Sequence, residues 1–350
     1  MSYAPPPLPR SKAEEPEGYR WTSDEIIKKL PESASIQGKV FIVTGTNAGL
    51  GEETARVLSA YGATVVMGSR NESAAKESKK RIIARHPKAS LKWIFLDLSD
   101  LQSVKDFVKQ FKALGIPLNG LICNAGIMAC PYETTKQGFE MQFGVNHLAH
   151  FLLIQLLIDD LVKAGPGSRV VCVSSKGHRF SGVRYDDIGF EGGKKYDPFE
   201  GYGQSKTANI LCAKAFNEIY SKQGVECFSL HPGMIPTELS KNMSPETRDT
   251  MLKGNIPNPF MRTFVKGAMM IQPYIRPLVG TLKPSWMKTV EQGAATQVFA
   301  ATSPELNGKG GVYLEDCHIY NPLTEEAADA TGENAKRLFA LSETLVAEYK

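Results

Sequence analysis

The sequence lacks the patterns that mark metal-binding, disulfide-rich and nucleic-acid-binding proteins. Its six cysteines include no Cys-x-x-Cys pair, and most of them lie in apolar stretches. This distribution predicts buried free thiols and no zinc site. The net charge of +4 is small and dispersed along the chain, which argues against a nucleic acid as partner. We therefore expect no metal centre and no nucleic-acid interface.

Two further absences narrow the chemistry. No Gly-x-Ser-x-Gly sequence surrounds Ser174 or Ser175, so a hydrolase of the serine type is not indicated. His147 and His150 lie three residues apart without supporting carboxylates or cysteines. A structural or surface role is therefore favoured over metal ligation for both.

The N-terminal region has no apolar segment of the length that a signal peptide or a membrane span requires. Four of the first nine residues are prolines, which predicts an extended arm that is either a disordered tail or an SH3-type ligand. A capping-box pattern from Thr22 to Glu25 then predicts a short helix. We expect a cytoplasmic protein in which residues 1–37 form this arm and helix.

The chain is organised around residues 39–51. Residues 40–43 are β-branched or aromatic, as is typical of a strand buried in a parallel sheet. A glycine-rich turn follows and leads into a helix-like segment, whose first N–H groups can bind phosphate. Glycines also occur in ordinary tight turns, so the pattern alone leaves both interpretations open. The residues assigned to a dinucleotide here are Gly45, Asn47, Gly49, Leu50 and Gly51.

Strand-like and helix-like segments alternate through the rest of the chain, which predicts right-handed βαβ units. The further strand-like segments are residues 64–67, 91–96, 118–122, 169–174, 225–230 and 311–314. No linker or repeat interrupts residues 38–350. We predict a single α/β domain of the Rossmann type, with a doubly wound parallel sheet and helices on both faces. Ligands bind such sheets beyond the carboxyl ends of the strands.

Polar motifs occur in a fixed order along this pattern. Asn124-Ala125-Gly126 follows the fourth strand, Asn146 lies in a long apolar helix-like segment, and Ser175 follows the fifth strand. Tyr202 and Lys206 come next, four residues apart. Each motif alone has an ordinary structural explanation. Together with the Thr-Gly-x-x-x-Gly-x-Gly turn, their order resembles the classical short-chain dehydrogenase/reductase family. The sequences VNHLAHF and SKTANIL are similar to its branch of retinol dehydrogenases, WW-domain oxidoreductases and protochlorophyllide reductases.

The resemblance implies a catalytic set of four residues: Asn146, Ser175, Tyr202 and Lys206. Residues four apart on a helix share a face, so Tyr202 and Lys206 can point into one cleft. A cation lowers the pKa of a phenol from about 10, which would let Tyr202 exchange a proton with the substrate oxygen. The family's pattern has Ser175 binding that oxygen and Asn146 holding a water linked to Lys206.

The second strand ends at Gly68-Ser69-Arg70, a small residue followed by a cation. This pair leaves space and positive charge for a 2′-phosphate and predicts NADP(H), although Arg70 as a solvated loop cation is the alternative. For Asp97 the resemblance implies a contact with the adenine, and a plain helix cap is the alternative. The further cofactor contacts that the resemblance implies are Asp97, Leu98, Asn124, Ala125, Gly126, Tyr202, Lys206, Pro232, Gly233, Ile235 and Thr237.

Residues 238–290 form an insertion where the family places its substrate lid. No acidic residue occurs between Asp249 and Glu291, while basic, aromatic and methionine residues alternate. Apolar and Met-rich walls suit a bulky apolar substrate. A basic, apolar stretch also suits an anionic membrane surface. We favour the lid, and a peripheral membrane contact is compatible with it.

The sequence thus predicts an NADP(H)-dependent oxidoreductase that interconverts a carbonyl and an alcohol on a fairly large apolar substrate by hydride transfer. One alternative is reduction of a carbon–carbon double bond by the same fold. Another is an NADP-binding scaffold or sensor that uses the proline-rich arm, but the presence of Ser175, Tyr202 and Lys206 argues against it. The resemblance also implies a homo-oligomer formed by paired helices.

Overall fold

The computed structural model describes residues 20–235, 287–322 and 324–350. The proline-rich arm, Thr237 and nearly all of the predicted lid lie outside these residues. The strands are β1 Val40–Thr44, β2 Thr64–Ser69, β3 Ser90–Phe95, β4 Gly120–Cys123, β5 Ser168–Val173, β6 Val225–His231, β7 Tyr313–Glu315 and β8 His318–Tyr320. The α-helices are α1 Ser23–Lys28, α2 Gly49–Ala60, α3 Glu72–Arg85, α4 Leu101–Lys112, α5 Met141–Phe143, α6 Ala149–Ala164, α7 Pro198–Tyr220, α11 Val290–Thr302, α12 Glu325–Ala328 and α13 Glu333–Leu345.

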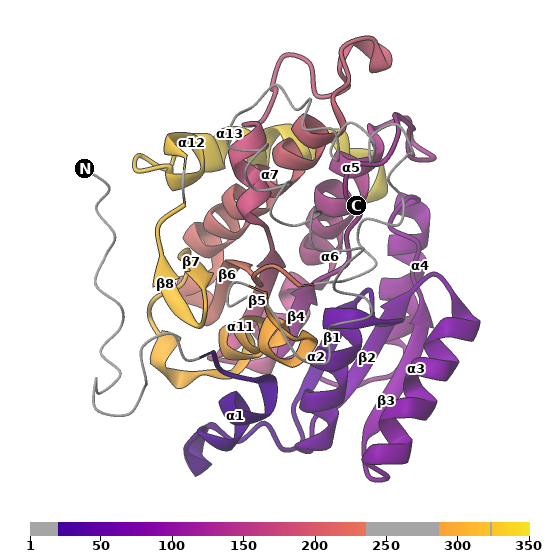
Figure 1. The fold of residues 1–350 in the computed structure, drawn as a ribbon, viewed down its shortest axis with the longest axis vertical. Coiled ribbons are helices and arrows are strands. Elements are labelled where there is room, and N and C mark those ends of the chain that lie inside the picture. Colours follow the sequence, from indigo (N-terminus) through magenta and orange to yellow (C-terminus); the bar gives the residue numbers. More distant parts are fainter. Residues whose placement is uncertain (1–19, 236–286, 323) are drawn as a thin grey trace.

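The described strands form one sheet in the order β3-β2-β1-β4-β5-β6-β7-β8 (Figure 1). Every pair from β3 to β7 is parallel, and only the edge pair of β7 and β8 is antiparallel. The predicted doubly wound parallel sheet is confirmed. The sequence pattern missed β8, which follows a tight turn in which Asp316 and Cys317 have φ of 49° and 60°.

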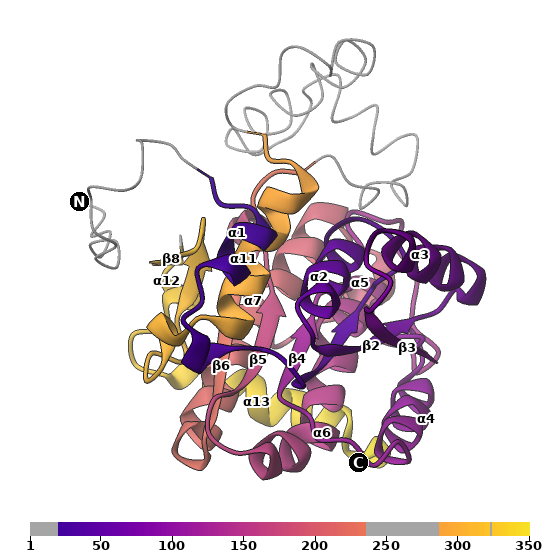
Figure 2. The ribbon, with the colours of Figure 1, turned by 90° about the horizontal axis from the view of Figure 1, so that it is seen from below.

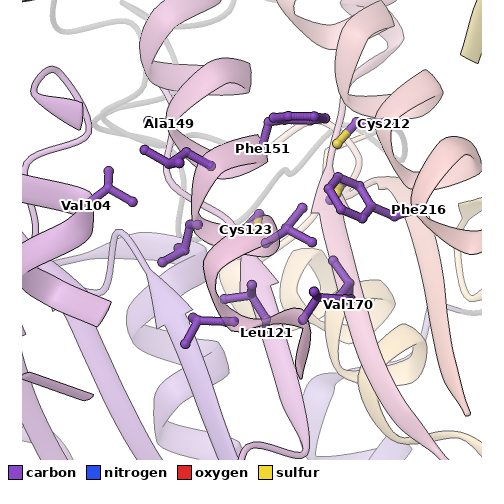
Figure 3. Close-up of a cluster of buried hydrophobic side chains, with 14 of the residues drawn as sticks. Val104, Leu121, Cys123, Ala149, Phe151, Val170, Cys212 and Phe216 are labelled. Atoms are coloured by element: carbon purple, nitrogen blue, oxygen red, sulfur yellow. The ribbon is translucent and has the colours of Figure 1, made fainter. Parts of the chain in front are cut away.

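Two helical layers cover the sheet (Figure 2). One apolar core lies between the sheet and α4, α6, α7 and α13, and the other between the sheet and α1, α2 and α11. Figure 3 shows part of the first core, where Phe151 of α6 and Phe216 of α7 lie above strand residues such as Leu121 and Val170. The stretch Met141–Ala164 is long and apolar enough to cross a membrane. It belongs instead to this buried core.

The cysteines also lie inside the molecule. All six are buried as free thiols, which confirms the prediction made from their apolar surroundings. Cys123 and Cys172 are neighbours on the paired strands β4 and β5, and Cys212 of α7 lies in the same core (Figure 3).

The predicted N-terminal helix α1 begins at the cap residue Thr22, whose hydroxyl accepts a hydrogen bond from the Glu25 backbone. An ion-pair cluster joins α1 to α2. The Arg56 guanidinium contacts both Asp24 and Glu53, and Ser23 donates to Glu53 at 2.5 Å. The Arg56 and Glu53 side chains are only 11% and 9% exposed, so each charge depends on its partner.

Replacing Glu53 with glutamine should therefore destabilise the protein by roughly 3 kcal/mol, because the Arg56 charge stays buried without its main partner. The control is Glu52→Gln, whose partner Arg81 is 53% exposed and whose loss should cost less than about 1 kcal/mol. Urea unfolding of the three proteins measures the difference. Equal losses for the two variants would contradict the importance of burial here.

Candidate active site

The glycine-rich turn after β1 has the geometry of a phosphate cradle. Gly45 and Gly49 have φ of 74° and 60°, a backbone region that favours glycine. A side chain at Gly51 would lie 2.2 Å from the Gly45 carbonyl oxygen. The cap residue of α2 is Ala48, which has no side-chain acceptor, so the first N–H groups of α2 stay open to an anion.

Two polar atoms at this turn also point to a ligand. Thr46 Oγ1 and Asn47 Oδ1 are buried, and neither has a hydrogen-bond partner within the described part of the chain. Buried polar atoms are normally paired. The residues of the turn therefore fit a nicotinamide dinucleotide, with its pyrophosphate at the start of α2.

Beyond β2 and β3, Arg70 and Asp97 lie beside each other. Their nearest charged atoms are 3.9 Å apart, and the Arg70 side chain is 71% exposed. Asp97 Oδ1 accepts two hydrogen bonds from Ser99, while Asp100 caps α4. The helix-cap alternative for Asp97 is thus wrong. Leu98 is buried in the apolar core beneath.

A chain of hydrogen bonds links the cofactor turns to the helical segment that carries Asn146. Thr44 Oγ1 accepts from the backbone N–H groups of Asn124 and Ala125, at 3.0 and 2.9 Å. It also lies 2.9 Å from His150 Nε2, and His150 Nδ1 lies 3.0 Å from the Asn146 carbonyl oxygen. A carbonyl only accepts, so Nδ1 carries the proton and Nε2 accepts from the Thr44 hydroxyl.

This histidine stays neutral because burial lowers the pKa of His150 to about 4. His147 is also buried, its pKa lowered to about 3 for the same reason, and its Nε2 lies 2.8 Å from Ser342 Oγ of α13. Both histidines are structural, and the surface alternative is excluded.

The long helix that the sequence predicts over about residues 138–163 spans Met141–Ala164, but it is not α-helical throughout. It begins as α5, opens into the π-helix Gly144–Leu148, and continues as α6. Asn146 lies in the π-helix, and its side chain bonds outside the helix. Oδ1 accepts from Ile127 N at 2.8 Å, while Nδ2 donates to Ile127 O and to Ser205 Oγ at 3.0 and 2.9 Å. Single π-turns within α-helices are frequent at functional sites.

Asn146, Gly126 and Lys206 are close neighbours. A side chain at Gly126 would lie 3.1 Å from Asn146 Oδ1 and 3.4 Å from Lys206 Nζ. Gly126 thus leaves room between the two groups. The turn that contains Gly126 is also bonded to α11, because Gln297 donates to Asn124 Oδ1 at 3.0 Å.

Helix α7 carries both Tyr202 and Lys206. It begins at Pro198 with Asp197 as its cap, so Tyr202 and Lys206 both lie within the helix. Both side chains are buried, and Lys206 Nζ lies 5.5 Å from the centroid of the Tyr202 ring. The ammonium donates to the Val173 carbonyl at 3.1 Å.

Burial sets the pKa values of this pair. Desolvation raises the pKa of Tyr202 to about 12, although a hydrogen bond with Ser175 lowers it in part. Desolvation also lowers the pKa of Lys206 to about 8. In the protein by itself, burial therefore outweighs the lowering of the Tyr202 pKa that we expected from Lys206.

Ser175 lies at the end of β5 and faces Tyr202. Its Oγ accepts from the Gly177 backbone N–H at 3.0 Å, which leaves the hydroxyl hydrogen to be donated. The neighbouring Ser174 instead donates to the Lys206 carbonyl at 2.7 Å. Of the two serines, Ser175 is thus the one whose hydroxyl hydrogen is not already donated to a backbone carbonyl.

The turn after β6 completes this edge of the sheet. Lys288 donates to the Pro232 carbonyl at 3.0 Å and pairs with Asp316. Gly233 has a φ of 98°. A side chain at Gly293 of α11 would lie 2.7 Å from both Ile235 and Leu50, so the two predicted cofactor residues meet over this glycine.

Sequence reasoning missed several supporting residues. They are Thr44, His150, Lys288 and Gln297. A polar residue ending an otherwise apolar strand was the available signal for Thr44. His150 lies 106 residues from Thr44, Gln297 lies 173 residues from Asn124, and Lys288 lies 56 residues from Pro232, all beyond the reach of local patterns.

Comparison with known proteins agrees with this geometry. A family model described as short chain dehydrogenase matches residues 39–248. WW domain-containing oxidoreductase of Homo sapiens is 34% identical over 336 residues, covering 94% of this chain and 73% of the relative. Short-chain dehydrogenase/reductase prx1 of Penicillium roqueforti is 36% identical over 338 residues, covering 93% and 90%.

Solved structures share the fold. A protein from Mycobacterium paratuberculosis superposes with a TM-score of 0.65 at 28% identity, covering 94% of this chain and 98% of that one. A short chain dehydrogenase of Escherichia coli CFT073, solved in complex with NADPH, gives a TM-score of 0.57 at 21% identity, covering 82% and 99%. The latter likeness concerns the fold alone.

The doubly wound sheet and its glycine-rich turn define a dinucleotide-binding oxidoreductase. This chain belongs to the short-chain dehydrogenase/reductase family, in the branch of the WW domain-containing oxidoreductases.

The hydrogen bonds that link the cofactor turns to the helical segment of Asn146 can be tested at Thr44. Thr44→Val should lower the free energy of unfolding by about 2 kcal/mol, because the Ala125 N–H loses its acceptor and His150 Nε2 loses its donor. Thr44→Ser keeps the hydroxyl and should cost less than about 1 kcal/mol. Urea unfolding measures both. A serine variant as unstable as the valine variant would show that the methyl group matters and the hydroxyl does not.

Proposed function

We propose that the protein is an NADP(H)-dependent oxidoreductase that interconverts a carbonyl and an alcohol on a fairly large apolar substrate. The observation that carries the proposal is the convergence of the buried Tyr202 and Lys206 with the half-buried Ser175 at the carboxyl edge of the sheet. A bound nicotinamide dinucleotide supplies or accepts the hydride. The protein's own side chains handle the proton and orient the substrate.

Tyr202 is the proposed acid and base. A phenol with a raised pKa is protonated at neutral pH, so Tyr202 can donate its proton to the oxygen of a carbonyl substrate. Ser175 donates a hydrogen bond to the same oxygen and polarises the carbonyl. In the reverse direction, Tyr202 accepts the alcohol proton, which requires the phenolate.

Lys206 stabilises that phenolate in the proposal. Its pKa of about 8 leaves the ammonium largely protonated at neutral pH. A positive charge beside the phenol favours the phenolate. Asn146 holds the Ile127 backbone beside Lys206. A water bound at this position would connect Asn146 with the ammonium, as the resemblance implies.

Arg70 and Ser69 support the choice of NADP(H) over NAD(H). Ser69 is buried and accepts a hydrogen bond from the Trp93 indole at 3.0 Å. Arg70 reaches into solvent beside it. A small residue and an arginine at this place accommodate a 2′-phosphate, whereas NAD-binding sites favour a carboxylate. Asp97 would then contact the adenine, and Thr237 the carboxamide.

The substrate class rests on the composition of residues 238–290, which lie mostly outside the described part. Their aromatic and methionine content supports an apolar substrate of some size.

Turnover tests the proposal directly. The full-length protein is incubated with NADPH and a panel of polycyclic ketones, long-chain aldehydes, quinones and enones, and the loss of NADPH absorbance is followed. Tyr202→Phe should reduce turnover by at least about a hundredfold and should still bind NADPH, because the other cofactor contacts remain. Product analysis separates carbonyl from double-bond reduction. NADPH binding without consumption in either reaction direction would favour the scaffold alternative instead.

Cofactor choice is tested at Arg70. Arg70→Ala should weaken NADPH binding by about ten- to a hundredfold, since one charge-assisted contact is lost, and should leave NADH binding unchanged. Lys76→Ala is the matched control. Lys76 lies in α3, shortly after Arg70, and its side chain is likewise a cation that is 71% exposed. Fluorescence titration gives each Kd. A similar loss for both cofactors would contradict recognition of the 2′-phosphate.

A further inference from the structure

The segment after Ser175 is a 3₁₀-helix, η3, over Lys176–Phe180. His178 in this segment folds back onto Ser175. The Ser175 carbonyl oxygen accepts two hydrogen bonds from His178, one from the backbone N at 3.1 Å and one from the ring Nδ1 at 2.6 Å. The side chain of His178 is fully buried.

The same segment is fixed to the catalytic helix. Thr207, the residue after Lys206, donates from its hydroxyl to the carbonyl oxygens of His178 and Ser181, at 3.1 and 2.8 Å. Gly177 packs so tightly on Tyr202 that a side chain there would lie 2.6 Å from the ring. Segment η3 thus sets the spacing between Ser175 and Tyr202.

The charge and tautomer of His178 follow from its contacts. The Ser175 carbonyl can only accept, so Nδ1 carries a hydrogen. Burial lowers the pKa of His178 to about 4, and Lys176 and Arg179 add to this effect. The Tyr313 ring packs edge-on against the imidazole, with centroids 5.7 Å apart. His178 is therefore a neutral, oriented donor at neutral pH.

We propose that His178 is a positioning residue, which acts through Ser175: its Nδ1–H holds the Ser175 backbone so that the Ser175 hydroxyl faces the Tyr202 phenol. This inference rests on the proposed function for its kinetic consequence. Its structural consequence, the Ser175–Tyr202 contact, does not depend on turnover.

Losing this orientation should change the titration of Tyr202. The Ser175 hydrogen bond is the contact that lowers the Tyr202 pKa against the effect of burial. Among the described residues, Lys206 on α7 and Tyr313 on β7 are ionisable groups beside Tyr202, and Lys176, Arg179 and His231 on β6 are ionisable groups near His178. They stay in place when His178 is replaced. Alcohol oxidation, which needs the phenolate, should then require a higher pH.

Two amide variants separate the role of Nδ1 from that of bulk and burial. His178→Asn places an amide donor where Nδ1 lies, and His178→Gln places it where Nε2 lies. We expect His178→Gln to lower kcat for alcohol oxidation about tenfold and to shift its pH profile to higher pH. The KM for the cofactor should not change. His178→Asn should restore both properties.

A second readout needs no substrate. Tyrosine labelled at Cζ reports the hydrogen bonding of each phenol by NMR, and the Tyr202 signal is the one absent from Tyr202→Phe. It should move in His178→Gln and return in His178→Asn. Thr207→Val, which frees the other end of η3, should move it in the same direction. If the glutamine variant does not fold, the threonine variant carries the test.

Identical Tyr202 signals in the natural protein and in the glutamine and valine variants would overturn the positioning role. If the signals shift as expected but the natural protein turns over no substrate, the positioning role stands and the proposed function fails.

Discussion

The buried ammonium of Lys206 is the constraint on which the arrangement of this site depends. A charge of this kind is costly away from water unless dipoles surround it. Here the carbonyl of Val173 accepts from it, and Asn146 lies next to it across Gly126. These groups are held in place by the ends of β4 and β5 and by the π-helix that carries Asn146. Because burial brings the Lys206 pKa close to neutrality, its charge responds readily to what binds nearby.

The fold was largely predictable from the sequence, because it depends on local patterns. The apolar runs of β1 to β6 and the helical periodicity between them are properties of neighbouring residues. The π-helix at Asn146 was not predictable, because its cause is tertiary. The Asn146 side chain is bonded to Ile127 and Ser205, and nothing in the surrounding apolar sequence indicates that shift. The edge strand β8 was missed because it is short and follows strained turn residues.

The candidate site was predictable as a set of positions but not as a set of interactions. The motif order indicated Ser175, Tyr202 and Lys206, and the structure brings the three together. Their electrostatics differ from the expectation, since burial shifts the Tyr202 pKa upward in the protein alone. A motif gives the distance between two residues along a helix, whereas desolvation depends on everything packed around them. The supporting role of His150 was not predictable either, because its partner Thr44 lies 106 positions away along the chain.

One contact ties the N-terminal region to a distant part of the chain. The Arg20 guanidinium donates to the Met287 carbonyl at 3.3 Å, three residues before α11 begins. Helix α1, which follows Arg20, packs on α11, which follows Met287. In polymer terms, this contact closes a loop that contains most of the domain, and closing so long a loop costs little more entropy than closing a shorter one. Helix α1 and the segment that leads into α11 therefore form one junction, which ties the N-terminal helix to the chain returning from the insertion.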